Sequence, residues 1–278
     1  MAENLQFFVA ATGGIHSDYV NTVNPYFEDF DGGNGALSAF ASESPIYRIG
    51  GGAGRAVTFN FGKVGSILKG SSLTLSYLGA ESSNPNDGSG LFNGNYAALG
   101  QLNFKVGVRV DLAATYVHGY HGAGSVLFYA GGVNSAVVGT TQANTLSTNN
   151  ASSINSYGFA AAFRPSDKLS ISGFLSYQDI TGFGANDDFE AWSYSLGVAP
   201  PDFGKQGNVL AVFAGAQPYS RGRIVGANEV LYHIEAFYKY QVSDNISITS
   251  GVILLTAPGQ SNNNDDAIIG TLRTTFTF

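Results

Sequence analysis

The sequence predicts an all-β protein, a transmembrane antiparallel up-and-down β-barrel of about twelve strands. Three observations favour this fold class. The last eleven residues, 268–278, alternate between a mostly apolar and a mostly polar row and end on an aromatic residue, as outer-membrane barrels commonly do. Charged residues make up only 12% of the 278 residues, whereas a soluble domain averages about 25%. No apolar run approaches the roughly 18 residues of a membrane helix, so crossing a membrane would require strands.

Alternation with a period of two marks the strands along the chain. Tyr232, Ile234 and Ala236, for example, alternate with His233 and Glu235, and we expect the first row to face lipid. The twelve segments with this pattern are, in chain order, residues 4–11, 54–61, 72–80, 95–105, 107–117, 154–164, 168–178, 189–198, 207–216, 229–241, 245–256 and 265–278.

The connections between these segments alternate in length, which is typical of a barrel with short turns on one rim and long loops on the other. We expect tight turns at residues 104–107, 165–167 and 242–244. An even number of strands places both termini on the short-turn rim. The long connections cover residues 12–53, 81–94, 118–153, 179–188, 217–228 and 257–264.

Aromatic residues lie at strand ends next to the shorter connections, where an interfacial girdle is expected. A soluble β-sandwich that acts as a binding module would show the same alternation and is the alternative fold. The girdle and the unequal rims favour the barrel. The girdle residues are Phe61, Phe104, Phe163, Tyr240 and Phe278.

The formal net charge of −7 is divided unevenly between the two predicted rims. Fourteen acidic residues and only four arginines fall on the long-loop side, and the opposite rim is mildly basic. Acidic groups at the mouth of a narrow passage concentrate cations and repel anions, so we expect a mild cation preference. The alternative is that the acidic loops only keep the outer surface soluble.

The sequence contains no pattern that requires a catalytic site, a metal or a cofactor. His233 and Glu235 are the nearest approach to the serine, histidine and carboxylate of a barrel hydrolase, the alternative function, but we favour a hydrogen bond in the lumen. The chain has no cysteine, and the spacing of His118 and His121 is a weak metal signal. No stretch is basic and aromatic enough to indicate a nucleic-acid partner.

The first long connection, from Thr12 to about Ala53, is too long for a plain loop in a compact domain. Such a connection can fold into the lumen of a porin-like barrel, so we expect a constriction element. An external surface loop is the alternative. The candidate pore-lining charges are Arg48, Arg55, Glu28, Asp29, Asp31, Glu235, Lys239 and Arg273.

Several stretches spread over most of the chain are specific enough to compare with a known family. The longest runs from His233 to Gln241 (HIEAFYKYQ) and is continued by residues 244–249, 255–258, 262–266 and 269–278. Earlier matches cover residues 35–38, 45–47, 50–54 and 88–94. Together these stretches resemble the cyanobacterial outer-membrane porins of the carbohydrate-selective (OprB-like) or iron-uptake porin family.

The resemblance implies a trimeric outer-membrane channel for ions and small solutes, with inorganic iron and sugars as substrates. It also implies a larger barrel of about 16 strands and a surface-layer-homology domain that has no counterpart in residues 1–278. We therefore expect one barrel domain over residues 1–278. It would contact outer-membrane lipid and act as a passive homotrimeric porin, with no enzymatic activity.

Overall fold

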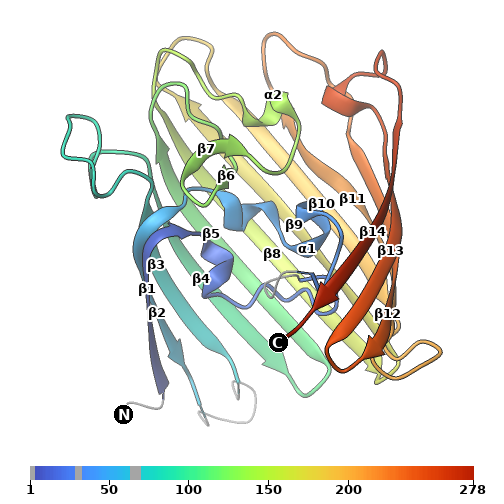
Figure 1. The fold of residues 1–278 in the computed structure, drawn as a ribbon. Coiled ribbons are helices and arrows are strands. Elements are labelled where there is room, and N and C mark those ends of the chain that lie inside the picture. Colours follow the sequence, from blue (N-terminus) through green and yellow to red (C-terminus); the bar gives the residue numbers. More distant parts are fainter. Residues whose placement is uncertain (1–3, 29–32, 63–69) are drawn as a thin grey trace.

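The computed structural model describes residues 4–28, 33–62 and 70–278, and its main feature is one strongly curved antiparallel sheet of twelve strands (Figure 1). Each of the twelve predicted segments forms one of these strands, so the predicted number and chain order are confirmed. The strands are β1 (Leu5–Gly14), β2 (Gly52–Asn60), β3 (Ser72–Gly79), β4 (Tyr96–Val106), β5 (Val110–His121), β8 (Ser152–Ser166), β9 (Leu169–Gly182), β10 (Phe189–Ala199), β11 (Val209–Arg221), β12 (Tyr232–Ser243), β13 (Ile246–Leu255) and β14 (Ala267–Phe276).

The order of strands in the sheet follows the chain from β1 to β14. Only β6 (Tyr129–Ala130) and β7 (Val133–Ala136) stand apart, as a hairpin within the connection between β5 and β8. Among the described residues β1 pairs only with β2, and β14 only with β13. The tail therefore does not pair with the first strand, and the two edge strands lie on opposite sides of the opening at the front of Figure 1.

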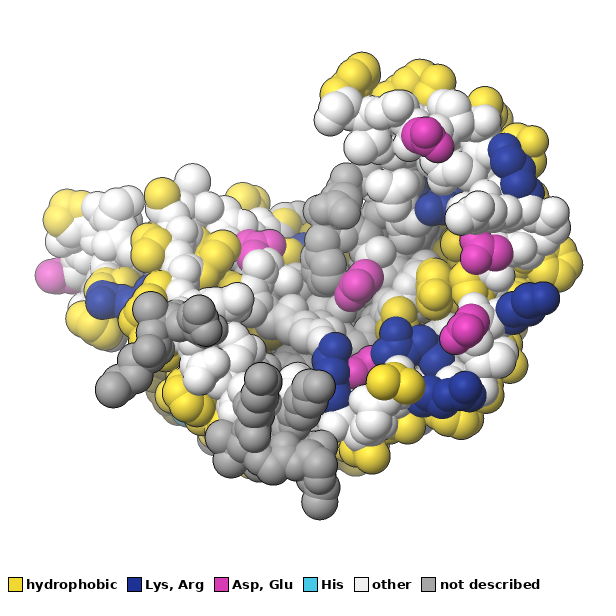
Figure 2. All heavy atoms as spheres, turned by 90° about the horizontal axis from the view of Figure 1, so that it is seen from below, with side chains coloured by type: hydrophobic (Ala, Val, Ile, Leu, Met, Phe, Trp, Pro, Cys, Tyr) yellow, Lys and Arg dark blue, Asp and Glu magenta, His cyan; other side chains and the backbone are white. Residues whose placement is uncertain are grey.

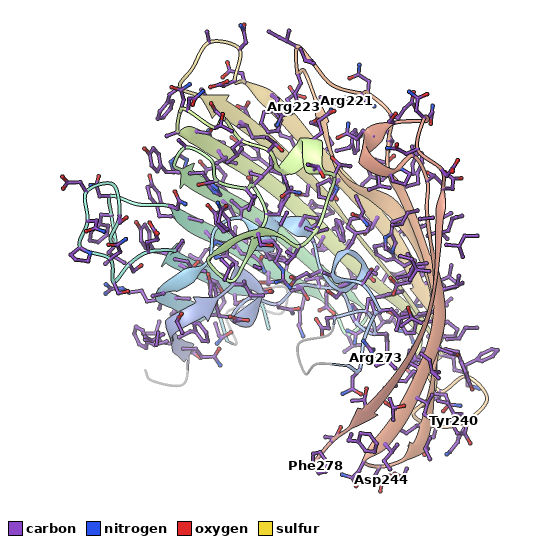
Figure 3. All side chains as sticks on the ribbon, turned by 45° about the horizontal axis from the view of Figure 1, so that its top comes forward. Arg221, Arg223, Tyr240, Asp244, Arg273 and Phe278 are labelled. Atoms are coloured by element: carbon purple, nitrogen blue, oxygen red, sulfur yellow. The ribbon has the colours of Figure 1, made fainter. Side chains whose placement is uncertain are left out.

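Short and long connections lie on opposite rims, as predicted. Turns at residues 107–109, 167–168 and 244–245 join consecutive strands on the short-turn rim. The amide of Thr277 donates a 2.9 Å hydrogen bond to the carbonyl of Asn245, so the carboxyl end lies beside a short turn. Figure 3 shows Tyr240, Asp244 and Phe278 at this rim, and Arg221 and Arg223 at the opposite one.

Side chains alternate between the concave and the convex face of the sheet. On β12, His233 and Glu235 are buried on the concave side, whereas Tyr232 and Ile234 are exposed on the convex side. This alternation is the predicted one. Because the convex face carries the exposed apolar residues, it is the face suited to contact lipid.

A row of aromatic rings crosses the convex face toward the long-loop rim. Successive ring centroids lie 5.4, 6.3 and 4.5 Å apart from β5 to β10. Rings with a polar edge accumulate at membrane–water interfaces, so the row marks a second girdle that the sequence analysis missed. Its members are cross-strand register partners: Tyr116, Tyr157, Tyr177, Trp192 and Tyr219.

The helices of the described residues are short, and they lie in connections that leave the sheet at the long-loop rim. The first long connection contains η2 (His16–Asp18), α1 (Ala39–Ser42) and η3 (Pro45–Arg48). The connection before β8 contains α2 (Thr141–Asn144), and η4 (Pro258–Gln260) precedes β14. Among the described residues, no helix has the length and apolar character needed to span a membrane.

Candidate functional site: the segment inside the sheet

Residues 15–28 and 33–51, here called the inner segment, lie within the curve of the sheet, as predicted (Figure 1). Its large apolar side chains Phe27, Phe40, Ile46 and Tyr47 are each no more than 2% exposed. Complete burial of one such side chain stabilises a fold by about 1.5–3 kcal/mol. The external-loop alternative therefore does not hold for this connection, because its apolar residues are covered by the wall.

Phe27 and Phe40 of the inner segment pack against one part of the wall, between β9 and β12. Phe40 makes edge contacts with Phe174 on β9, Phe213 on β11 and His233 on β12, with ring centroids 5.7, 5.3 and 5.3 Å away. The ring centroids of Phe27 and Phe213 lie 5.7 Å apart. These contacts join three strands from one part of the sheet, between β9 and β12, to a single short segment.

Glycines on the concave face leave room for this packing. A Cβ atom on Gly197 of β10 would lie 2.7 Å from the ring of Phe27, and one on Gly158 of β8 would lie 2.9 Å from Ile46. Real Cβ atoms do not approach other heavy atoms so closely. The close approach of Phe27 to the wall therefore favours glycine at position 197, whereas at position 158 a Cβ atom would lie so close only to the terminal methyl group of Ile46.

Glu235 is the main polar anchor between wall and inner segment. Its carboxylate, which is 0% exposed, accepts hydrogen bonds from the amide of Leu37 (2.6 Å) and from Ser38 Oγ (2.5 Å). Ser38 Oγ also accepts from the amide of Ala41 and so caps α1. Hydrogen bonds to a buried carboxylate are among the stronger ones in proteins. Glu235 thus holds the start of α1 against β12.

Arg273 anchors the same segment from β14, the edge strand. Its guanidinium donates to the carbonyls of Gly35 (2.7 Å) and Ala36 (3.0 Å). On β9, Ser172 Oγ donates to Asn24 Oδ1 at 2.8 Å. Glu235 and Arg273, both predicted as pore-lining charges, are therefore brought together on the inner segment, where they hold its backbone.

Two other predicted residues pair with partners inside the inner segment itself. Arg48 forms an ion pair with Glu43, whose burial raises its carboxyl pKa while the charge of Arg48 opposes this rise. Glu28 accepts a 2.7 Å hydrogen bond from Thr22. Asp29 and Asp31 lie outside the described residues.

Arg55 lies on the convex face of the sheet, away from the inner segment. It is the register partner of Val9, which is 77% exposed, and of Tyr77, and all three lie on the convex face. The expectation that Arg55 lines the pore is therefore wrong, because it shares its side of β2 with Val57 and not with Ala56. Lys239, by contrast, lies on the concave face as the register partner of Thr249, whose own partner is Arg273.

The histidine of β12 does not have the arrangement of a hydrolase. Glu235 Oε2 and Ser38 Oγ both approach Nε2 of His233, at 3.1 and 3.3 Å, and Gln217 occupies Nδ1 at 2.9 Å. A catalytic histidine lies between the nucleophile and the acid, with one at each ring nitrogen. The arrangement agrees with the lumen hydrogen bond favoured from the sequence. Among the described residues, no group of three or more acidic or histidine side chains could hold a metal ion.

A second connection, residues 122–151, also packs inward. Leu127 and Phe128 are 0% exposed, and Phe128 forms an isolated bridge with Ile49 of the inner segment. Thr140 Oγ1 donates to Gln260 at 2.7 Å, which ties this connection to η4. A role in the lumen was not predicted for this connection, although it too is longer than a plain loop in a compact domain.

The charged groups are distributed more widely than the two-rim prediction implies. Glu43 is buried in the inner segment, whereas Asp179 and Glu190 are register partners on the convex face. Asp187 and Asp265 remain on the long connections. Seen from the short-turn side, the molecule is an open ring in which acidic and basic side chains both lie around the central hollow (Figure 2).

The chain is similar to known proteins over its whole length. The family model described as the carbohydrate-selective porin, OprB family, matches residues 1–278. An uncharacterized protein of Nostoc sp. strain PCC 7120 is 67% identical over 274 residues, which cover 98% of this chain and 48% of that protein. An uncharacterized protein of Synechocystis sp. strain PCC 6803 is 27% identical over 299 residues, which cover 100% of this chain and 52% of that protein. The chain thus spans about half the length of these relatives, and no solved structure matches it.

Proposed function

Because the chain belongs to the carbohydrate-selective porin (OprB) family, we propose that it forms the wall and the constriction of a passive outer-membrane channel for sugars and other small hydrophilic solutes. The observation that carries the proposal is the attachment of the inner segment to the wall through Glu235 and Arg273. A segment fixed across a lumen narrows it to a constant width. A channel of this kind needs neither a cofactor nor an enzymatic step.

The concave face of β9 carries uncharged hydroxyl and amide groups. On β9 its inward side chains include Ser170, Ser172, Ser176 and Gln178, and no charged residue. Hydroxyl and amide groups both donate and accept hydrogen bonds, as sugar hydroxyls and water do. These four side chains are at most 2% exposed, so they do not contact a passing solute, and we propose the sugar preference from the family alone.

We extend the proposal to inorganic cations, iron included, with a mild cation preference. The support is the net charge of −7 and the acidic residues of the long connections, which outnumber Arg221 and Arg223 there. Reversal potentials in a salt gradient test this part. Anion preference, or no preference, would contradict it and leave the sugar channel intact.

The convex face supports placement in the outer membrane, since its exposed residues are largely apolar and are bordered by aromatic residues. We also propose that the chain assembles as a homotrimer, as the family resemblance implies. Mass measurement by light scattering in detergent tests the trimer independently of conductance.

Single-channel conductance in a planar bilayer tests the constriction. Because η2 (His16–Asp18) lies in contact with η3 (Pro45–Arg48), residues 19–47 can be excised and replaced by a short glycine–serine linker. Conductance should rise, because the excision removes Phe27, Phe40 and Tyr47 from the lumen. The control is removal of residues 83–93, which belong to a connection that projects away from the sheet (Figure 1). Equal conductance in the two variants would contradict the proposal.

A further inference from the structure

Arg55 is a charged residue on the face of the sheet that we assign to lipid. It lies in a cross-strand row with Val9 and Tyr77. The neighbouring row, two residues further from the long-loop rim, is the apolar set Phe7, Val57 and Leu75. An isolated charge beside hydrocarbon is costly unless a group of opposite charge lies next to it.

The two rows border a groove on the convex face. Its volume is about 540 Å³, which is within the range of small-molecule sites. Phe7, Val9, Val57 and Leu75 supply apolar walls, and Arg55 with Tyr77 lies at the end nearer the long-loop rim. The groove therefore has an apolar body and a cationic end.

The depth of the groove follows from the aromatic residues beside it. The ring of Tyr77 stacks on Tyr96 at 5.4 Å, and Tyr96 stacks on Tyr120 at 6.0 Å. Stacked tyrosines of this kind lie at the level of lipid headgroups. Arg55, in the same row as Tyr77, lies at headgroup depth. Val57 and Leu75 lie one row deeper, at the depth of acyl chains.

The protein provides no anion for Arg55 on these strands. The described residues of β1, β2, β3 and β4 include no aspartate or glutamate. Arg221, at the same rim on the far wall, lies 5.1 Å from the ring of Tyr219 and donates to the carbonyl of Asn228. Of these two convex-face arginines, Arg221 has partners within the protein, and Arg55 is the one that we consider for an external anion.

We propose that the groove of β1–β3 binds one anionic phospholipid, with its phosphate on Arg55 and an acyl chain along Phe7, Val57 and Leu75. The inference rests on the proposed function, because it requires the convex face to lie in lipid. An arginine matches a phosphate in charge and hydrogen-bonding geometry, and the apolar body of the groove matches the acyl chain. Zwitterionic lipids should bind less tightly, because their headgroups carry no net charge.

Fluorescence quenching by brominated lipids tests the proposal in bilayers containing the 278-residue chain. In a Trp192→Phe background, Phe59→Trp places a reporter on the convex face, one row beyond the groove. The matched reporter is Phe159→Trp, which borders an apolar hollow of about 360 Å³ on β8–β10 that has no charged lining residue. Brominated phosphatidylglycerol is compared with brominated phosphatidylcholine at each reporter.

We expect about a fivefold preference for phosphatidylglycerol at Phe59→Trp, the factor expected for one arginine at a charged membrane surface, and none at Phe159→Trp. Arg55→Gln should abolish the preference, whereas Arg55→Lys should retain most of it and Arg221→Gln all of it. Equal quenching by both lipids in the unmodified groove would overturn the proposal, and so would a preference that survives Arg55→Gln.

Three further outcomes separate the alternatives. Loss of the preference on adding inorganic phosphate to the buffer would show a site for free phosphate and overturn the lipid assignment. Quenching at Phe159→Trp but not at Phe59→Trp would show that a second copy of the chain covers the groove, and would also overturn it. Absence of quenching at both reporters would instead overturn the proposed membrane location on which the inference rests.

Discussion

Replacing Glu235 should release the inner segment from the wall. The carboxylate accepts hydrogen bonds from the amide of Leu37 (2.6 Å) and from Ser38 Oγ (2.5 Å). A hydrogen bond to a charged group contributes about 1.5–3 kcal/mol, so Glu235→Ala should weaken attachment of the segment by about 3–6 kcal/mol. Glu235→Gln retains one acceptor oxygen, and its effect should be about half as large. The population of the detached segment should then rise by about a hundredfold to ten-thousandfold in Glu235→Ala, and by about tenfold to a hundredfold in Glu235→Gln.

Single-channel recording shows this change directly. We expect higher mean conductance and greater open-channel noise in Glu235→Ala, with Glu235→Gln intermediate, and faster proteolysis within residues 33–44. Thr271→Ala is the matched control, because Thr271 lies on the concave side of β14 but in the register of Gly251, whereas Glu235 is in the register of Ile253. If both Glu235 variants conduct and resist proteolysis like the unmodified chain, the carboxylate does not hold the segment and the reasoning fails.

Three other changes give distinct outcomes. Gly197→Ala should lower the free energy of unfolding in urea by about 1–3 kcal/mol, because its Cβ would lie 2.7 Å from Phe27, whereas Gly270→Ala, with no atom within 4 Å, should have little effect. Phe40→Ala should cost about 3–5 kcal/mol in the same assay, and a smaller loss would show that its ring contacts are loose. Burial lowers the pKa of His16 from 6.5 to about 3, so between these pH values the unfolded chain binds a proton that the folded chain does not. The free energy of unfolding should therefore fall by a few kcal/mol as the pH is lowered from about 6.5 to about 3. His16→Gln should reduce that fall.

The strands and the inner segment could be predicted because their signals are local. A period of two along β12 separates Tyr232 and Ile234 from His233 and Glu235 without any knowledge of the partner strands. The length of the first connection was enough to indicate insertion. The same local signal could have placed Arg55 correctly, since it alternates in phase with Val57 and Phe59 and out of phase with Ala56 and Thr58.

The anchors could not be predicted, because they depend on contacts between distant parts of the chain. Nothing near Leu37 indicates that its amide will meet a carboxylate 198 residues away. No turn near Gly197 explains why glycine occurs at this position. Its role is seen only when Phe27 is placed against β10. The aromatic row from Tyr116 to Tyr219 likewise depends on cross-strand register, which alternation within one strand does not fix.

The distance in sequence between the anchors and their partners has a consequence for the order of folding. Glu235 and Arg273 meet the inner segment across 198 and 238 residues, so the attachment cannot form until β12 and β14 are in place. Contacts of such separation require the largest loop closure and form late. We therefore expect the newly folded wall to enclose a wide passage first. The narrowing of that passage is the last step of maturation, although the residues that narrow it precede β2 to β14 in the chain.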